Sequence, residues 1–276
     1  MTNKLVIVCG WYFDKFDDKE NQTDYIEGLI ELQKRDDVDV FYACHNDPPQ
    51  IVESNFRYMR FPNIGLEWGA YNKAWQYLSD EHGIADATLL LFIQDDIVVH
   101  DWKFVDIVSA ALTQGAGVVG NGPAYPWNFN PEEEARLSFW LKTNDTWVDY
   151  VREENKHFYD KQQLTFGVRG SFVSLKNSDM KRINGFDYVD KPMQMGVKED
   201  GTEFALIDPF GNTSMYMNSY KFGRVLGNGT IKYLSNEYRK SQWLLECGRG
   251  AVETPGEREG KEGVIDVPVE MVLEVE

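Results

Sequence analysis

The strongest constraint on the fold is the segment Thr88–Val99 (TLLLFIQDDIVV), an apolar run interrupted by the adjacent carboxylates Asp95 and Asp96. Its apolar part, Leu89–Ile93, is typical of a strand buried on both faces of a parallel sheet. In an open α/β sheet, ligands bind beyond the carboxyl ends of such strands. Two charges there need a cation or hydrogen-bond donors. The segment therefore predicts a site for Mg²⁺ or Mn²⁺; the alternative is a turn with both carboxylates in water.

Strand and helix patterns alternate before this segment. Leu5–Cys9 and Val38–Cys44 are predicted strands, and the helix between them is predicted to start at Asp24, whose spacing to Glu27 fits a capping box. The strand–helix–strand order predicts a parallel sheet with right-handed crossovers, and so an α/β fold. The next helix carries a stripe at helical spacing that should face the core: Trp68, Tyr71, Trp75 and Leu78.

Regular structure is also predicted beyond the acidic strand. The patterns indicate a helix at Lys103–Leu112 and strands at Gly117–Gly120 and Leu164–Leu175. A short helix follows, capped by Ser178 and ended at Asn184–Gly185, because Asn and Gly adopt the left-handed conformation that closes helices.

Composition excludes several classes of function. The 276 residues include 45 acidic and 28 basic side chains, and the formal net charge of −17 repels phosphate backbones, so nucleic-acid binding is not expected. No apolar run is long enough for a membrane span or a secretory signal, which predicts a cytoplasmic protein. The three cysteines are odd in number and lack metal-ligand spacing, as expected of reduced thiols.

A change in composition divides the chain into a domain at 1–250 and an acidic linker and C-terminal arm at 251–276. Residues 252–263 are rich in Gly, Glu and Lys, whereas 264–276 alternate apolar and acidic side chains. Such alternation is typical of a half-buried strand rather than a solvated tail. The arm is predicted to pack either on its own domain or on a partner subunit. In the second case the chain would form a homo-oligomer.

Four segments resemble, in order, the GT-A glycosyltransferases and specifically glycosyltransferase family 2. A helix opening with Asn63 and Gly65 and carrying Asn72 resembles the family's Asn-x-Gly helix, and FIQDDI resembles its strand ending in a DxD element. Residues 169–187 resemble the family's strand and helix before GGFDE, and residues 215–226 (MYMNSYKFGRVL) its helix ending in Gly. The likeness covers about residues 4–235.

The resemblance implies a Rossmann-like GT-A fold with a mostly parallel central sheet. It also implies an enzyme that uses Mn²⁺ or Mg²⁺ to transfer a sugar from a nucleotide-sugar donor to a hydroxyl of a carbohydrate or other acceptor, with inversion. The metal would stabilise the departing diphosphate.

The resemblance also implies a donor site. Asp96, the last position of the DxD element, would ligate the metal, and Asp95 would assist through water or the ribose. Asn46 and Asp47 follow the second strand and would hold the nucleobase; the alternative is an ordinary Asx turn. Asn72 would reach the base or ribose, unless it is a plain surface residue.

The chain departs from the family pattern at several positions. Gln94 takes the first acidic position of the DxD element, and Tyr71 stands where the family often has Arg. The phosphate contact is then missing or is supplied by Lys73 or Arg169. No histidine lies near the end of the catalytic domain, where many GT-A enzymes complete the metal site.

A general base is needed to take the acceptor proton in an inverting transfer. Glu199 and Asp200 fit the family's acidic pair by identity, whereas counting back from the helix that ends at Gly223 leaves Asp208 as the nearest carboxylate. Asp200 ranks ahead of Asp208 on this basis. A solvated acidic loop is the alternative.

The aromatic loop with Tyr125 and Trp127 is predicted to form a platform for the acceptor, with core or lid packing as the alternative. Two other functions remain open. A sugar nucleotidyltransferase would need a Gly-rich basic loop after the first strand, which CGWYFDKFDD does not provide. A non-catalytic, GT-A-derived binding protein would be consistent with Gln94 and the missing late histidine.

Overall fold

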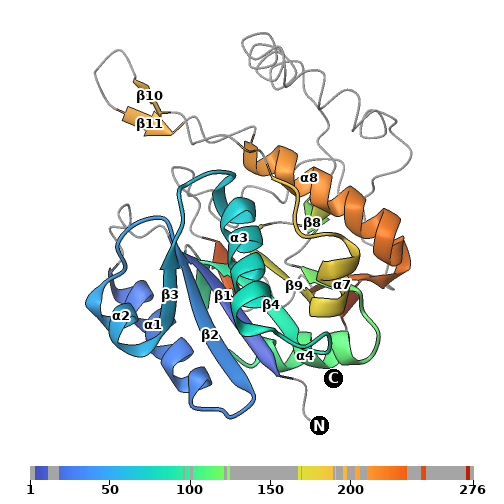
Figure 1. Cartoon of the computed structure of the whole chain (residues 1–276), viewed down its shortest axis with the longest axis horizontal. Helices are drawn as coiled ribbons and strands as arrows, with labels where there is room; N and C mark the ends of the chain where they lie inside the picture. Colours follow the sequence, from blue (N-terminus) through green and yellow to red (C-terminus); the bar gives the residue numbers. More distant parts are fainter. Residues whose placement is uncertain are drawn as a thin grey trace, which may run out of the picture.

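An eight-stranded sheet forms the centre of the molecule (Figure 1). The computed structural model describes residues 4–11, 19–95, 97–99, 102–120, 123–124, 167–168, 170–188, 190, 195–197, 203–205, 210–234, 244–246 and 272–273. The strands, in their order across the sheet, are β14 (Val272–Leu273), β12 (Ile231–Leu234), β6 (Val118–Gly120), β9 (Phe172–Lys176), β4 (Leu89–Gln94), β1 (Leu5–Trp11), β2 (Val38–Cys44) and β3 (Arg57–Arg60). Only β9 runs antiparallel to its neighbours in this sheet. The predicted α/β class with a mostly parallel sheet is confirmed.

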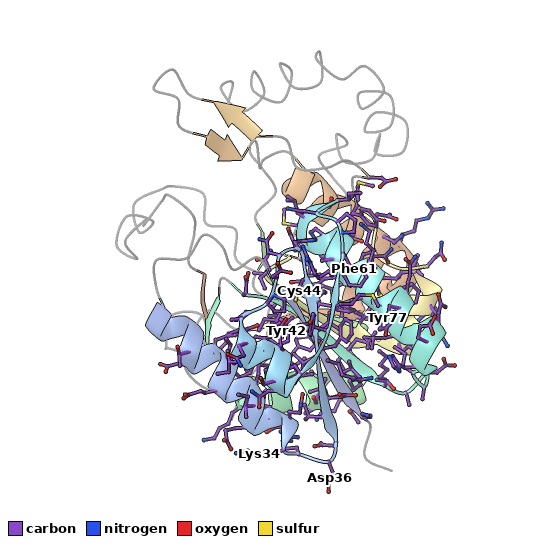
Figure 2. The ribbon with its side chains drawn as sticks, turned by 60° about the vertical axis from the view of Figure 1, so that its left-hand side comes forward. Lys34, Asp36, Tyr42, Cys44, Phe61 and Tyr77 are labelled. Atoms are coloured by element: carbon purple, nitrogen blue, oxygen red, sulfur yellow. The ribbon has the colours of Figure 1, made fainter. Side chains whose placement is uncertain are left out.

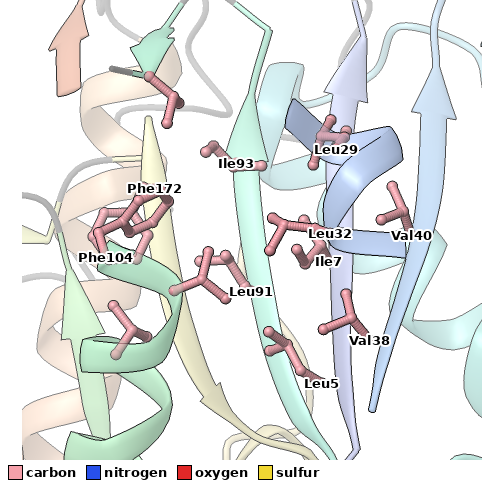
Figure 3. Packing of buried hydrophobic residues seen from close by; sticks show 14 of the residues in the cluster. Leu5, Ile7, Leu29, Leu32, Val38, Val40, Leu91, Ile93, Phe104 and Phe172 are labelled. Carbon is pink, nitrogen blue, oxygen red and sulfur yellow. The ribbon is translucent and has the colours of Figure 1, made fainter. Parts of the chain in front are cut away.

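Helices cover both faces of the sheet, because side chains alternate along each strand. Leu5 and Ile7 face the cluster formed with α1 (Lys19–Gln33), α2 (Gln50–Asn55) and α4 (Phe104–Thr113), part of which is drawn in Figure 3. Val6 and Val8 face the opposite cluster, formed with α3, α7 and α8. These last helices span Leu66–His82, Asn177–Arg182 and Phe210–Phe222.

The acidic strand is divided at its carboxylates. Residues Leu89–Ile93 of β4 are fully buried, as the apolar run predicts. Ile97–Val99 forms a separate strand, β5, which pairs antiparallel with β13 (Leu244–Glu246) outside the main sheet. The turn that begins at Asp95 therefore marks the carboxyl end of β4.

Helix α3 fits its predicted stripe, since Trp68, Tyr71 and Leu78 are buried and Trp75 packs against the same cluster. Gly83 closes the helix at φ 58°.

Asn177 fixes the connection from α3 to β4. Its Oδ1 accepts a hydrogen bond from Trp75 Nε1 at 2.9 Å, and its Nδ2 donates to the carbonyls of Ile84 at 2.9 Å and Ala85 at 3.1 Å. A fully buried amide with these partners holds the loop without leaving polar atoms unsatisfied.

Two predicted helix starts were wrong. α1 begins at Lys19, so Asp24 lies inside the helix; only the part from Tyr25 onward carries the apolar periodicity that the prediction used. α7 begins at Asn177, so Ser178 lies in its first turn.

The predicted helix end at Asn184–Gly185 is confirmed. Asn184 and Gly185 have φ values of 56° and 75°, and the Gly185 N–H donates to the Met180 carbonyl at 3.0 Å. The predicted strand Leu164–Leu175 is described as β8 (Gly167–Val168) and β9, with Gly170 and Ser171 in a turn before β9.

The described part of the C-terminal arm is β14, which pairs in parallel with Tyr233–Leu234 of β12 at the edge of the sheet. This part of the arm packs on its own domain. The domain division at residue 250 and an oligomer formed through the arm stay predictions. Among the helices of the described residues, none has the length and apolar character needed to span a membrane.

Truncation after Gly250 should destabilise the domain, because it removes the strand paired with β12. We expect the free energy of unfolding to fall by about 1–2 kcal/mol and the melting temperature by roughly 2–8 °C. Differential scanning calorimetry and gel filtration of the truncated and full-length chains measure this. An unchanged melting temperature and elution volume would show that the arm contributes nothing.

Candidate active site

The candidate site lies where the strand order reverses. From β1 the chain moves to β2 and β3 on one side, and it then returns to place β4 on the other side of β1. In open α/β sheets, ligands bind in the crevice at the carboxyl ends of such strands. Asp95 lies there, directly after β4, and is 8% exposed.

Both neighbouring strands fix the backbone at this point. The Asp95 N–H donates to the Gly10 carbonyl of β1 at 3.1 Å, and the Gln94 N–H donates to the Ser171 carbonyl next to β9 at 3.0 Å. These two hydrogen bonds fix the backbone from which the Asp95 side chain extends.

Four titratable groups of β1, β2 and α1 feel the charge of Asp95. The Tyr25 hydroxyl lies 3.7 Å from the Cys9 sulfur, and burial raises the pKa values of both groups and of Tyr42. Burial raises the pKa of Cys44 to about 12, and the Asp95 charge adds to the rise at each group. Cys9 and Cys44 are free thiols, and all four groups are uncharged at neutral pH.

Tyr71 connects α3 to the end of the sheet. Its hydroxyl donates to the Gly170 carbonyl at 2.9 Å, and a Cβ at Gly10 would lie 3.1 Å from its ring. Tyr71 therefore links α3 to the turn before β9, at the position where the resemblance would place an Arg.

Asn46 and Asp47 follow β2, on the same edge of the sheet as Asp95. Asp47 forms an exposed ion pair with Arg60 at the end of β3, with Oδ1 and Nη1 2.6 Å apart. Exposed pairs contribute only about 0–1 kcal/mol, so Asp47 remains accessible to a ligand.

His45 lies beside these residues and is mostly buried. Its Nδ1 is 3.1 Å from the Phe61 carbonyl, and burial lowers the pKa of the ring. Phe61 itself donates its N–H to the Cys44 carbonyl at 2.8 Å, and Figure 2 shows Tyr42, Cys44 and Phe61 near the end of β2.

The Asn184–Asp187 turn is hydrogen-bonded to two helices. Asn72 of α3 accepts the Phe186 N–H at 2.9 Å through Oδ1. Asn218 of α8 accepts the Asp187 N–H at 2.8 Å and donates to the Asp187 carbonyl at 2.7 Å. Asn72 is buried, and its oxygen positions this turn; its predicted contact with the donor stays a prediction.

Lys221 adds a charged connection to the same turn. Its Nζ lies 2.5 Å from Asp187 Oδ1 and donates to the Gly185 carbonyl at 3.0 Å. Sequence reasoning missed Asn218 and Lys221. The spacing of Ser214, Asn218 and Lys221, one helical turn apart along α8, is the signal that marks this polar face.

Lys73, one of the two alternative phosphate contacts, lies beside Tyr188. Its Nζ is 5.8 Å from the centre of the Tyr188 ring, and burial lowers its pKa. The Tyr188 ring occupies the space that a Cβ at Gly65 would need, and Gly65 has a φ of 80°.

Several predicted site residues lie outside the described residues: Asp96, Arg169, Tyr125, Trp127, Asp200 and Asp208. Their roles stay predictions. Within the described part of the chain, no three His, Cys, Asp or Glu side chains gather closely enough to hold a metal ion.

The strand order and the two covered faces show an α/β fold with a mostly parallel central sheet. No family model and no curated protein matches the chain.

Several solved structures are similar to the chain. A Drosophila β1,4-galactosyltransferase 7 mutant in complex with manganese, UDP-Gal and xylobiose is 11% identical at a TM-score of 0.35, covering 72% of this chain and 58% of its own. A mannose-1-phosphate geranyltransferase from Thermus thermophilus is 14% identical at 0.37, covering 66% and 60%. S. aureus TarS with UDP-GlcNAc is 18% identical at 0.30, covering 46% and 36%. The chain thus spans less than two thirds of each of these structures.

Replacing Asn218 with Ala should lower the free energy of unfolding by about 1–3 kcal/mol. The change removes the two part-buried hydrogen bonds to the N–H and the carbonyl of Asp187, each worth about 0.5–1.5 kcal/mol. Urea denaturation measures the effect. The exposed Arg224→Ala variant is the control and should change stability by less than about 0.5 kcal/mol. Equal effects of the two changes would mean that the turn does not depend on Asn218.

Proposed function

We propose that the chain is a metal-dependent glycosyltransferase that moves a sugar from a nucleotide-sugar donor to a hydroxyl acceptor, with inversion. The observation that carries this proposal is the position of Asp95. It lies at the reversal of strand order, with its backbone hydrogen-bonded to β1, and the next residue in the chain is Asp96.

The residues at this edge fit a hard divalent cation. A carboxylate that is 8% exposed is costly to keep charged, and a positive ion bound to it would stabilise the charge. Carboxylate oxygens are the ligands that Mg²⁺ and Mn²⁺ prefer. Asp96 would hold the ion and Asp95 would assist. The bound ion supplies Lewis-acid stabilisation of the leaving diphosphate.

The nucleotide would extend from this point toward β2 and β3. Asn46 and Asp47 lie at the carboxyl end of β2 and would contact the base, while Arg169 or Lys73 would contact phosphate. Tyr125 and Trp127 would form the acceptor platform. The platform is supported by the position of β7 (Pro123–Ala124), which pairs with β8 and directly precedes Tyr125.

Asp208 is the better candidate for the general base. Asp200 belongs to the connection between β10 (Met195–Val197) and β11 (Glu203–Ala205), and this hairpin stands apart from the central sheet in Figures 1 and 2. Asp208 precedes α8 by two residues, and α8 packs against α3 and β8. The position of α8 supports Asp208, and Asp200 is the alternative.

The metal assignment predicts that Asp96→Asn abolishes Mn²⁺-dependent binding of UDP or GDP. The change removes one anionic ligand without changing the shape of the side chain. Isothermal titration of each nucleotide with and without Mn²⁺ measures it, and circular dichroism checks the fold. Asp86→Asn, at an exposed carboxylate paired with Lys181, should bind like the unmodified protein. Retained Mn²⁺ dependence in Asp96→Asn would rule out the assignment.

The base assignment predicts that Asp208→Asn lowers kcat by about 10²–10⁴ and leaves the donor Kd unchanged, because a general base acts only on the transition state. Asp200→Asn should stay close to the unmodified rate. The reverse pattern would make Asp200 the base. Donor binding without turnover in the unmodified protein would favour the non-catalytic binding protein.

A further inference from the structure

The turn before Tyr188 is hydrogen-bonded to α3 on one side and to α8 on the other. Asn72 of α3 accepts the Phe186 N–H through Oδ1 at 2.9 Å. Asn218 of α8 bonds both the N–H and the carbonyl of the next residue, Asp187. Because these contacts are one residue apart, the turn fixes the position of α8 relative to α3, against which α8 packs (Figure 1).

On its α3 side the turn has little freedom to shift. Gly185 has a φ of 75°, and a Cβ there would lie 2.3 Å from Asn72 Oδ1 and 3.0 Å from the Trp75 ring. Phe186 is buried, and its ring centre lies 5.2 Å from that of Trp68 in α3. Movement between α3 and α8 would therefore take place where α8 contacts the turn.

Lys221 supplies the charged contact between α8 and the turn. Its Nζ lies 2.5 Å from Asp187 Oδ1 and donates to the Gly185 carbonyl at 3.0 Å, and its side chain is 19% exposed. The amide of Asn218 already binds the Asp187 backbone, so the ion pair acts on the side chain of Asp187 instead. We call Asp187, Asn218 and Lys221 the α8 clasp.

A second lysine–aspartate pair nearby lies in a different environment. Lys181 of α7 pairs with Asp86, with Nζ and Oδ1 2.6 Å apart and side chains 52% and 70% exposed. Exposed pairs of this kind contribute little to stability, because water screens the charges. The Lys221 pair is less exposed and has a second partner in the Gly185 carbonyl, so it restrains α8 more strongly.

Both candidate general bases lie between the two sides of the clasp. Asp200 and Asp208 follow Asp187 in the chain and precede α8, which begins at Phe210. A general base has to lie within hydrogen-bond reach of the hydroxyl that it deprotonates. A misplacement of about 1 Å can cost about 10² in rate. The separation of α8 from the donor side of the molecule therefore matters for the chemical step.

We propose that Lys221 is a positioning residue for sugar transfer. Through Asp187 it holds α8, and with it the segment that carries the general base, at a fixed distance from α3 and the donor site. This inference rests on the proposed glycosyltransferase function. Lys221 needs no contact with the donor in this role, so its loss should slow the chemical step and leave donor binding intact.

The test separates nucleotide binding from turnover. Release of UDP from UDP-galactose or UDP-N-acetylglucosamine, and of GDP from GDP-mannose, gives kcat in Mn²⁺ with water as the acceptor. Isothermal titration of UDP or GDP gives the nucleotide Kd. Lys221→Met should lower kcat about tenfold and change the Kd less than about twofold. Lys181→Met removes the same charge from the exposed pair and should change neither.

A second variant keeps the inference testable if circular dichroism shows that Lys221→Met does not fold. Asp187→Asn keeps the shape of the side chain and the backbone contacts with Asn218, and it removes the charge. It should also lower kcat about tenfold. Combining the two changes should lower kcat no further than either change alone, because both remove the same ion pair.

The outcomes separate the two proposals. If the unmodified protein turns over none of the three donors, the proposed function fails and this inference fails with it. If it does turn over a donor, equal kcat values for Lys221→Met and Lys181→Met would show that the ion pair does not position the base. An equal loss of nucleotide affinity would show that the clasp shapes the donor site, and losses that multiply in the double variant would show that the two side chains act separately. Each of these three results overturns this inference and leaves the proposed function standing.

Discussion

The hydrogen bonding of β4 on both sides is the constraint on which the candidate site depends. β1 pairs with β4 in parallel and β9 pairs with it antiparallel, and both pairings extend to the end of the strand. Because the side chains before Gln94 are buried on both faces, a shift of one residue would exchange two well-packed faces. The register is therefore fixed, and with it the position at which Asp95 leaves the sheet.

Buried amides hold the loops around this strand. Asn72, Asn177 and Asn218 are each almost fully buried, and each forms hydrogen bonds with the backbone of a distant segment. A hydrophobic side chain at these positions would leave loop carbonyls or N–H groups unsatisfied. The connections between helices and strands are thus set by specific polar contacts, while the apolar clusters supply most of the burial.

The sequence predicts the elements whose signal is local. Continuous apolar runs located β1, β2 and β4, the aromatic stripe located the buried face of α3, and Asn184–Gly185 located the end of a helix. The start of α1 was missed because its first turns carry no apolar periodicity. Asn218 and Lys221 were missed because their partners lie 31 and 34 residues away.

The segment between Asp187 and α8 is fixed at both ends. Asn218 and Lys221 of α8 bind Asp187, so the two ends of the segment are held at a fixed separation. Lengthening such a closed segment is inexpensive, at about 0.6 kcal/mol for each doubling. Changes in the length of this segment should therefore cost the domain little stability, and the strands of the sheet should keep their places.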